Sequence, residues 1–229
     1  MSGETGLVVE DLRKRYEGVT ALAGVSLEVP DGAVHALAGP NGSGKTTLLA
    51  ALAGLVTPTS GTIRRPPGAV GVGFQEPNVY PSLSVRENLA VFGAMVDAEP
   101  SWRASLAERL RLRPVMDREV GALSDGYRKK LDLALATLRK PPLLLFDEPL
   151  ADLDDLTSRR LVELVEELAT SGRVIVVSTH DVDAFATPLD GLTVLYDGRV
   201  ISAATGDALE RPGETYRAAV DGLTDRPSE

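Results

Sequence analysis

Short runs of consecutive apolar residues recur along the central and C-terminal parts of the chain. Such runs are typical of strands buried on both faces, because helices cover the two sides of a parallel sheet. The pattern predicts buried strands at Ala33–Ala38, Ala69–Phe74, Leu143–Phe146, Arg173–Ser178 and Leu192–Tyr196.

Two stretches beside these strands carry apolar residues at helical spacing. One helix is predicted over Lys45–Leu55, directly after a glycine-rich loop, and another over Thr157–Thr170, where leucine and valine recur on one face. Strand and helix therefore alternate over residues 33–54 and again over 143–196. This alternation predicts an α/β fold with a mostly parallel sheet.

The N-terminal part has a different pattern, in which short apolar segments are separated by glycine and proline. This pattern is typical of antiparallel strands joined by turns. It predicts strands at Leu7–Leu12, Val25–Val29 and Thr62–Arg64. We expect them to form an antiparallel sheet that lies against the core.

Residues 84–140 are mostly helical in pattern, with helices predicted over Val85–Met95, Trp102–Leu112 and Asp125–Arg139. The two prolines that follow end the last helix and return the chain to the sheet. We interpret this segment as a helical subdomain inserted between strands of the core.

The whole pattern predicts one domain over about residues 1–212. Residues 213–229 are polar and contain glycine and proline. Such a segment is expected to be a tail that frays.

Composition and charge narrow the function classes. A chain of 229 residues suits one large domain with its own hydrophobic core. The absence of cysteine excludes disulfides, thiolate zinc sites and thiol catalysis. A formal net charge of −9 argues against a broad positive field, so no nucleic-acid partner is expected. Three short basic clusters, at Arg13–Arg15, Arg64–Arg65 and Arg128–Lys130, are interpreted as solvated surface.

Neither a signal peptide nor a membrane span is visible in the sequence. The first residues lack a basic segment followed by an apolar one, and no apolar run approaches the ~20 residues that span a bilayer. We therefore expect any association with a membrane to depend on a partner.

The strongest chemical signal is a glycine-rich loop between a predicted strand and a predicted helix. Glycine lets the backbone wrap closely around a phosphate, and successive N–H groups and the helix N-terminus point at the anion. Lys45 is placed to reach the β- and γ-phosphates, and the Thr46 hydroxyl is placed to coordinate Mg²⁺. The loop that we expect to bind ATP consists of Gly39, Pro40, Asn41, Gly42, Ser43, Gly44, Lys45, Thr46 and Thr47.

Two adjacent carboxylates, Asp147 and Glu148, follow the apolar strand Leu143–Phe146. The carboxyl ends of strands are where α/β sheets place their ligands. Asp147 suits the Mg²⁺ shell, through water, because Mg²⁺ keeps several of its waters. Glu148 is the candidate general base that orients and deprotonates the attacking water. Together with the glycine-rich loop, this pair predicts a Mg²⁺-dependent ATPase.

The segment Leu123-Ser124-Asp125-Gly126-Tyr127 lies before a predicted helix and shortly upstream of Asp147. With the two motifs above, it resembles the ABC-type ATPases, whose signature at this place is usually Leu-Ser-Gly-Gly-Gln. The resemblance implies that Ser124 and Gly126 contact the γ-phosphate of ATP held by the opposite subunit. Asp125 and Tyr127 depart from the pattern, as they often do in exporter-type members. Taken by itself, Ser124 is also the expected N-cap of the helix.

Further landmarks of the family follow in order, and the resemblance covers residues from about 7 to 208. Gln75 resembles the glutamine that touches Mg²⁺ and the attacking water, and His180 resembles the histidine that contacts the γ-phosphate. Tyr16 is similar to the aromatic residue that stacks on adenine. Ser84–Leu89 looks like the start of the family's helical subdomain, and Ala151–Asp154 looks like the loop that crosses the dimer interface.

The resemblance implies the fold of the P-loop NTPases and a homodimer in which two copies face each other head to tail. Each ATP lies between the glycine-rich loop of one copy and the signature of the other. The implied catalytic residues are Lys45, Gln75, Glu148 and His180, and the implied Mg²⁺ ligands are Thr46, Gln75 and Asp147. His35 has no comparable setting and is interpreted as a strand residue that fills space.

A family member of this size resembles the ATP-binding subunit of a transporter, which is cytoplasmic and held at the inner face of the membrane by a separate permease. The altered signature favours export over import. One alternative is a soluble ABC ATPase that is not coupled to transport, for example in cluster assembly. Another is a module that holds ATP without turnover, because Asp125 and Asp152 are unusual in the family. A GTPase is disfavoured, because no Asn-Lys-x-Asp or Thr-Lys-x-Asp motif is present.

Overall fold

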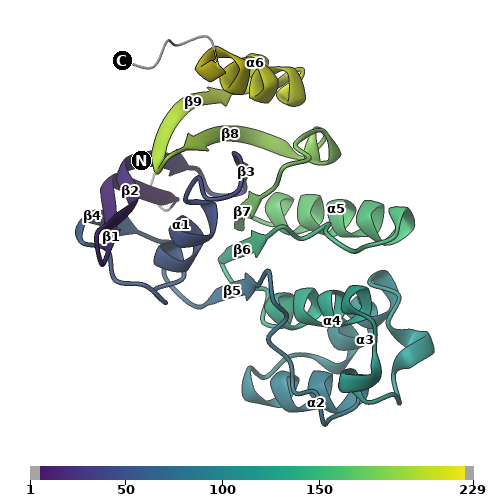
Figure 1. Cartoon of the computed structure of the whole chain (residues 1–229). Helices are drawn as coiled ribbons and strands as arrows, with labels where there is room; N and C mark the ends of the chain where they lie inside the picture. Colours follow the sequence, from purple (N-terminus) through teal and green to yellow (C-terminus); the bar gives the residue numbers. More distant parts are fainter. Residues whose placement is uncertain (1–5, 225–229) are drawn as a thin grey trace, which may run out of the picture.

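Two sheets form the framework of the molecule in the computed structural model, which describes residues 6–224 (Figure 1). The larger sheet has six strands in the order β5-β6-β7-β3-β8-β9. Their bounds are β3 (Val34–Ala38), β5 (Val70–Gly73), β6 (Leu143–Asp147), β7 (Val174–Ser178), β8 (Leu189–Tyr196) and β9 (Arg199–Thr205). Each strand from β5 to β8 pairs in parallel with its neighbours, which confirms the predicted mostly parallel sheet.

Strand β9 is antiparallel to β8 and is missing from the prediction. The two strands are joined by the two-residue turn Asp197-Gly198, in which φ is +46° and +69°. An Asp-Gly pair with positive φ at both residues is the preferred connection of a β-hairpin. The local signal for this strand is therefore present in the sequence, but the alternation of apolar and polar residues in β9 is weak.

The smaller sheet is antiparallel, as predicted, in the order β2-β1-β4. It consists of β1 (Leu7–Tyr16), β2 (Val19–Val29) and β4 (Ser60–Arg64). Its inner face packs with α1 (Lys45–Leu52) against the six-stranded sheet, in a core cluster that includes Leu12, Leu22 and Leu48. This cluster holds the loop before α1 between the two sheets.

The helices between residues 84 and 140 form a separate group beside β5 (Figure 1). They are α2 (Val85–Met95), α3 (Pro100–Arg109) and α4 (Asp125–Thr137), with the short helices η1 (Arg113–Val115) and η2 (Val120–Ala122). Ser84 begins α2 with a capping box, in which its hydroxyl accepts from the Glu87 N–H and the Glu87 carboxylate accepts from the Ser84 N–H. The helical group predicted for this stretch is present.

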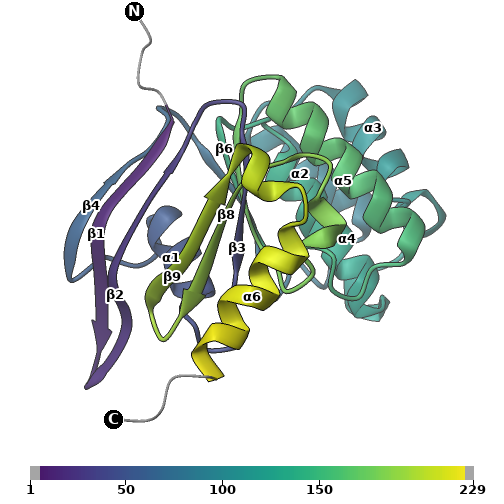
Figure 2. The same ribbon diagram turned by 90° about the horizontal axis from the view of Figure 1, so that it is seen from above.

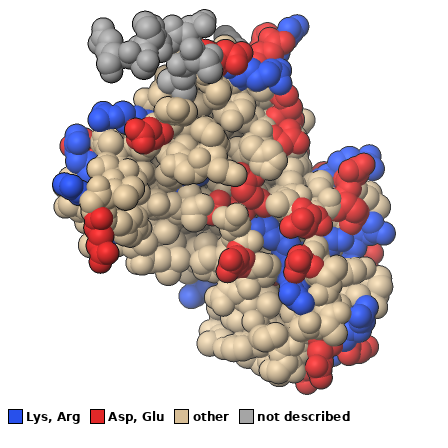
Figure 3. Space-filling model, viewed as in Figure 1, with Lys and Arg blue, Asp and Glu red and all other residues tan. Residues whose placement is uncertain are grey.

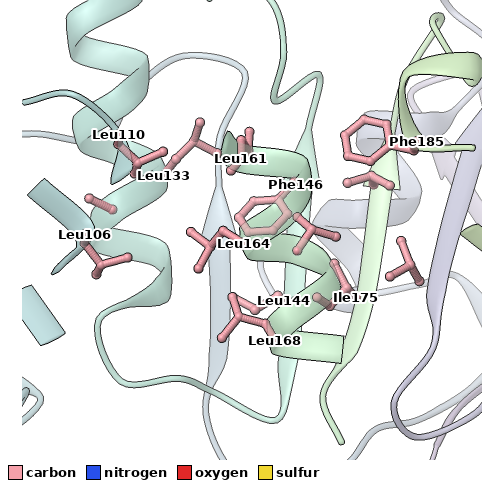
Figure 4. Packing of buried hydrophobic residues seen from close by; sticks show 14 of the residues in the cluster. Leu106, Leu110, Leu133, Leu144, Phe146, Leu161, Leu164, Leu168, Ile175 and Phe185 are labelled. Carbon is pink, nitrogen blue, oxygen red and sulfur yellow. The ribbon is translucent and has the colours of Figure 1, made fainter. Parts of the chain in front are cut away.

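A second core cluster joins the helical group to the sheet (Figure 4). Leu106 and Leu133 contribute to it from the helical group, and Phe146 contributes from β6. The helix α5 (Asp155–Thr170) supplies Leu161 and Leu164 from one face, as its periodicity predicts. Because these side chains are fully buried, the helical group and the sheet share one continuous core.

The basic cluster Arg128–Lys130 is not the solvated face that the sequence predicts. Lys130 is buried, and its Nζ donates to Asp154 at 2.7 Å. Asp154 is the N-cap of α5 and also accepts from the Thr157 N–H at 3.0 Å. The hydrogen bond from Lys130 holds the pKa of Asp154 well below its usual value. Lys130, which the sequence predicts to be on the surface, therefore links α4 to the start of α5.

The segment after Arg211 is not a fraying tail over its described part. Residues Pro212–Thr224 form α6, which lies across β8 and β9 (Figure 2). Tyr216, Ala219 and Val220 pack against the main core cluster, and the short helices η3 (Asp183–Phe185) and η4 (Gly206–Leu209) lie in the same C-terminal part. The prediction of a tail rests on the polar, glycine- and proline-containing composition and overlooks that Tyr216, Ala219 and Val220 have helical spacing. The placement of a domain boundary near residue 212 stays a prediction.

The surface carries both signs of charge. Lys and Arg are interspersed with Asp and Glu on the face shown in Figure 3, and neutral residues cover most of its middle. Among residues 6–224, no helix has the length and apolar character needed to cross a bilayer.

His35 is buried in β3, and its Nε2 lies 2.9 Å from the Thr193 hydroxyl. Burial lowers the pKa of His35 from 6.5 to about 4. A histidine that resists protonation in the folded state stabilises the fold fully above pH 6.5, and this contribution is lost as the pH falls toward 4. At about 1.4 kcal/mol per pKa unit, the loss reaches about 3 kcal/mol.

We therefore expect His35→Gln, which retains a hydrogen-bonding group but does not titrate, to weaken this pH dependence. The free energy of unfolding should be measured by urea titration at pH 7 and pH 4.5 for both proteins. The expected result is a smaller fall in the variant, by about 2–3 kcal/mol. An equal fall in both proteins would contradict the role assigned to His35.

Candidate functional site

The loop between β3 and α1 has a backbone that only glycine accommodates at three positions. Gly39, Gly42 and Gly44 have φ of +148°, +81° and +107°. A Cβ on Gly39 would lie 2.2 Å from the Leu195 carbonyl oxygen, so the strand β8 leaves no room for a side chain there. The Ser43 N–H donates to the Pro40 carbonyl at 3.1 Å, which curls the loop. A glycine-rich loop of this kind at the N-terminus of a helix can surround an anion with backbone N–H groups.

The side chains of the loop are arranged around the same space. Lys45 is buried, and its Nζ donates to the Gly39 carbonyl at 2.7 Å and to the Pro40 carbonyl at 3.3 Å. The Ser43 hydroxyl is buried without a hydrogen-bond partner among the described residues. Buried polar groups are normally paired, so an orphaned hydroxyl beside a buried ammonium fits a loop whose missing partner is a phosphate.

A cavity of about 420 Å³ opens above this loop. It brings together five separate segments of the chain, including the predicted residues Gln75, Asp147 and Glu148. Strand β2 closes its other side, which the sequence does not predict. The lining residues are Val19, Thr20, Ala21, Asn41, Gly42, Ser43, Gly44, Lys45, Thr46, Thr47, Gln75, Asp147, Glu148 and Asp197.

A second cavity, of about 630 Å³, shares Asn41, Gln75 and Glu148 with the first. His180 lies in this second space, together with Lys129 and Asp152. The two cavities therefore adjoin at the end of the glycine-rich loop. The remaining lining residues are Gly39, Pro40, Glu76, Ala151 and Tyr216.

Glu148 and His180 form a direct pair. The Nδ1 atom of His180 lies 2.9 Å from Oε2 of Glu148. The Glu148 side chain is only 17% exposed, whereas that of His180 is 74% exposed. Glu148 also has a φ of +46°, a strained conformation for a residue with a side chain. Its backbone and its carboxylate are therefore both held by neighbouring groups.

Ser178 is a site residue that sequence reasoning missed. It ends β7 opposite Asp147 in the parallel pairing of β6 and β7. Its hydroxyl donates to the Asp147 carboxylate and accepts from the Glu148 N–H at 3.0 Å. One hydroxyl thus orients both acidic residues, and only the pairing of two strands from distant parts of the chain reveals it.

Three predicted residues lie outside both cavities. Tyr16 is at the end of β1, is 43% exposed and contacts Lys14, whose Nζ lies 4.7 Å from the ring centroid. Ser124 is at the N-cap position of α4, but its side chain makes no capping hydrogen bond. Gly126 packs against the Asp152 carbonyl, where a Cβ would lie at 2.6 Å. Within one chain, the signature segment is therefore apart from the glycine-rich loop.

A magnesium ion fits the first cavity by the chemistry of its lining. Thr46, Gln75 and Asp147 bring a hydroxyl, an amide oxygen and a carboxylate to the same space. Mg²⁺ prefers oxygen ligands and takes one or two carboxylates together with water and phosphate oxygens. No cluster of three or more His, Cys, Asp or Glu side chains suited to a metal occurs in residues 6–224.

The sequence comparisons place these features in a known context. The family model described as "ABC transporter" matches residues 22–151. The lantibiotic transport ATP-binding protein SrtF of Streptococcus pyogenes is 32% identical over 218 residues, covering 92% of this chain and 95% of the relative. The phosphonates import ATP-binding protein PhnC 2 of Synechococcus sp. is 39% identical and covers 84% of each chain.

Solved structures agree with the sequence relatives. The ATP-binding subunit of an ABC transporter superposes with a TM-score of 0.83 at 27% identity, covering 96% of this chain and 98% of the other. A dimeric ATP-binding cassette, MJ0796, with bound ADP and Pi, superposes with a TM-score of 0.77 at 25% identity, covering 87% of this chain and 98% of the other.

The position of Ser178 generates a test of the site geometry. We expect Ser178→Ala to lower kcat for ATP hydrolysis about tenfold, because both acidic residues lose a shared hydrogen bond that orients them. The Kd for ATP should change less than about threefold, since Ser178 lines neither cavity. Steady-state hydrolysis and calorimetric titration with a non-hydrolysable ATP analogue measure the two quantities.

Ser171→Ala is the matched control, because its hydroxyl bonds only the Glu167 carbonyl at the exposed end of α5. The control should keep the wild-type kcat. A Ser178→Ala protein with wild-type kcat would show that the carboxylates do not depend on this hydroxyl.

Proposed function

The chain belongs to the ABC transporter family and is an ATPase, and on that premise we propose that it is the energy-providing subunit of a transporter. In this proposal two copies close around two ATP molecules and drive a separate membrane-spanning subunit. The observation that carries the proposal is the assembly of the phosphate loop, Asp147, Glu148 and Gln75 around one cavity.

The loop Gly39–Thr47 binds the ATP phosphates through its backbone N–H groups and Lys45. The carbonyl contacts of Lys45 lie inside the loop, so its ammonium has only a short way to turn toward the β- and γ-phosphates. Thr46, Gln75 and Asp147 are proposed to hold Mg²⁺, which when bound neutralises charge on the phosphates. Catalysis then depends on positioning and electrostatics.

Glu148 is the proposed general base. A carboxylate that accepts a hydrogen bond from His180 on one oxygen keeps its other oxygen for the attacking water. Because Glu148 lines both cavities, its carboxylate is within the space where the γ-phosphate would end. His180 and Gln75 are proposed to stabilise the charge that develops on the transferred group.

The site is proposed to be completed by a second copy of the chain. Ser124 and Gly126 line neither cavity, yet Ser124 is exposed at the start of α4, where a partner's nucleotide can reach it. The structurally similar cassette MJ0796 is described as dimeric with ADP and Pi. Tyr16, exposed at the end of β1, is proposed to stack on adenine beyond the first cavity.

The membrane subunit is proposed to dock beside β5, which places this chain at the inner face of the membrane. Strand β5 is at the edge of the larger sheet, and a groove of about 280 Å³ runs between it and the helical group. Phe74, Phe92 and Val96 give this groove apolar walls. On the neighbouring surface of α2, Met95 is 71% exposed.

Export is the proposed direction of transport. The departures Asp125 and Tyr127 in the signature support it. The relatives include the Nod factor export ATP-binding protein I of Burkholderia orbicola, which is 35% identical and covers 87% of this chain and 70% of that relative. Import proteins are also among the relatives, so their names do not separate the two directions.

We expect Glu148→Gln to lower the rate of ATP hydrolysis at least about 100-fold, because the amide cannot accept the proton of water. The variant should retain ATP and form a stable dimer, which light scattering and analysis of the extracted nucleotide would measure. Lys45→Ala in the same background is the control and should stay monomeric without ATP. A monomer of Glu148→Gln that holds ATP would contradict the composite site, and wild-type turnover would contradict the role of Glu148.

The docking surface has its own test. Met95→Glu should abolish co-purification with a polytopic membrane protein, while ATP hydrolysis by the chain alone stays at the wild-type rate. Ala203→Glu is the matched control, because it adds the same charge to the exposed face of β9 at the opposite edge of the sheet. If the wild-type chain co-purifies with no membrane protein from its native membranes, the result would favour an ABC ATPase that is not coupled to transport.

A further inference from the structure

Two charged residues of α4, Lys129 and Asp132, are buried, and no motif accounts for them. Lys129 is 4% exposed and Asp132 is 2% exposed. They are three residues apart, so they lie on the same face of the helix. That face is turned toward the ends of β5 and β6, where the ATPase site is located.

The carboxylate of Asp132 closes the loop that carries Gln75. Its two oxygens accept from the Phe74 N–H at 2.8 Å and from the Asn78 N–H at 2.9 Å. Only Gln75, Glu76 and Pro77 lie between these two anchor points. One side chain from a different element therefore holds both ends of a short loop.

Lys129 holds the same loop from its other side. Its Nζ donates to the Phe74 carbonyl, and to the Asp147 carbonyl at 2.9 Å. The N–H and the C=O of Phe74 are thus both bonded to charged side chains of α4. Through Lys129, the end of the loop is also tied to the end of β6, where the candidate Mg²⁺ ligand Asp147 stands.

Burying the charges of Lys129 and Asp132 costs desolvation free energy, so their role is not explained by stability alone. Burial raises the pKa of Asp132 to about 6 and lowers the pKa of Lys129, so the fold carries both charges against a desolvation penalty. The burial of charged groups is weak evidence that they stabilise a fold. The contacts of this pair go mainly to backbone groups of one loop, which indicates that they specify its geometry rather than add to stability.

We propose that Asp132, supported by Lys129, is a positioning residue of the ATPase that fixes Gln75 relative to the start of α4. Gln75 lines both cavities of the site, and α4 begins next to Ser124. A contact that shifts the signature of one copy would move α4 and, through Asp132, the loop of Gln75. The inference rests on the proposed role of Gln75 in hydrolysis.

Asp132→Asn in the full chain tests the proposal, because it keeps the size of the side chain but not its two acceptors. The amide oxygen of Asn can accept from one of the two N–H groups, but its NH₂ is a donor and cannot accept from the other. We expect kcat to fall at least about tenfold and the Kd for a non-hydrolysable ATP analogue to change less than about threefold. Peptides that cover residues 74–80 should exchange their amide hydrogens faster than in the wild type.

A loss of stability is separated from a loss of positioning by a control and a double mutant. Leu106→Ala removes a buried side chain of α3 that lines neither cavity, and it should lower the unfolding temperature while kcat stays near the wild-type value. If Asp132 acts through Gln75, Asp132→Asn should add little to the loss of kcat in Gln75→Ala. Independent effects would multiply instead.

The other possible results of these measurements would contradict either the positioning role of Asp132 or the role of Gln75. Wild-type kcat and amide exchange in Asp132→Asn would overturn the positioning role, as would multiplicative losses in the double mutant. Wild-type kcat in Gln75→Ala would overturn both the proposed role of Gln75 and the inference that rests on it. If Asp132→Asn shows no cooperative unfolding, Asp132→Ser, which is smaller and retains one acceptor, takes its place in the same measurements.

Discussion

The parallel pairing of β3, β6 and β7 is the constraint on which the site depends. Hydrogen bonds between these strands align Leu37 and Asp147 with the same residue, Ser178, so three chain segments end at one edge of the sheet. The glycine-rich loop, the acidic pair and the segment with His180 leave the sheet from that edge. Parallel strands place their carboxyl ends together, which is why an α/β sheet gathers ligands there. A slip in this pairing would separate the carboxylates from the loop.

Buried charge is used in this fold to hold backbone geometry. Lys45 bonds two carbonyls of the glycine-rich loop, and Lys129 and Asp132 bond the loop that carries Gln75. Asp154 receives the buried Lys130 and caps α5. Charged groups form stronger hydrogen bonds than neutral ones, and in a dry environment they fix direction as well as distance. The loops around the phosphate site are therefore held in place without the help of a nucleotide.

The single chain contains one continuous part of a site and one separate part. The phosphate loop and the acidic pair share a cavity, whereas Ser124 and Gly126 at the start of α4 line neither this cavity nor the adjoining one. In the proposed dimer, this separation would give ATP a structural role in addition to its chemical one, because a nucleotide bound to one part would join it to the other part of a second copy. Because Asp132 of α4 is hydrogen-bonded to the loop of Gln75, a shift of α4 on dimer formation would change the position of Gln75 at the proposed site.

The sequence by itself determined the phosphate loop, the buried strands and the family, because these depend on local rules. Glycine is needed where φ is positive, and apolar runs are needed where both faces of a strand are covered. Tertiary structure decided the rest. Ser178 reaches Asp147 across 31 residues of sequence, and the buried Lys130 is paired with Asp154, which is 24 residues away. The placement of α6 was likewise decided by tertiary structure. Its apolar residues Tyr216, Ala219 and Val220 have helical spacing, but spacing alone does not specify that the helix packs against β8 and β9.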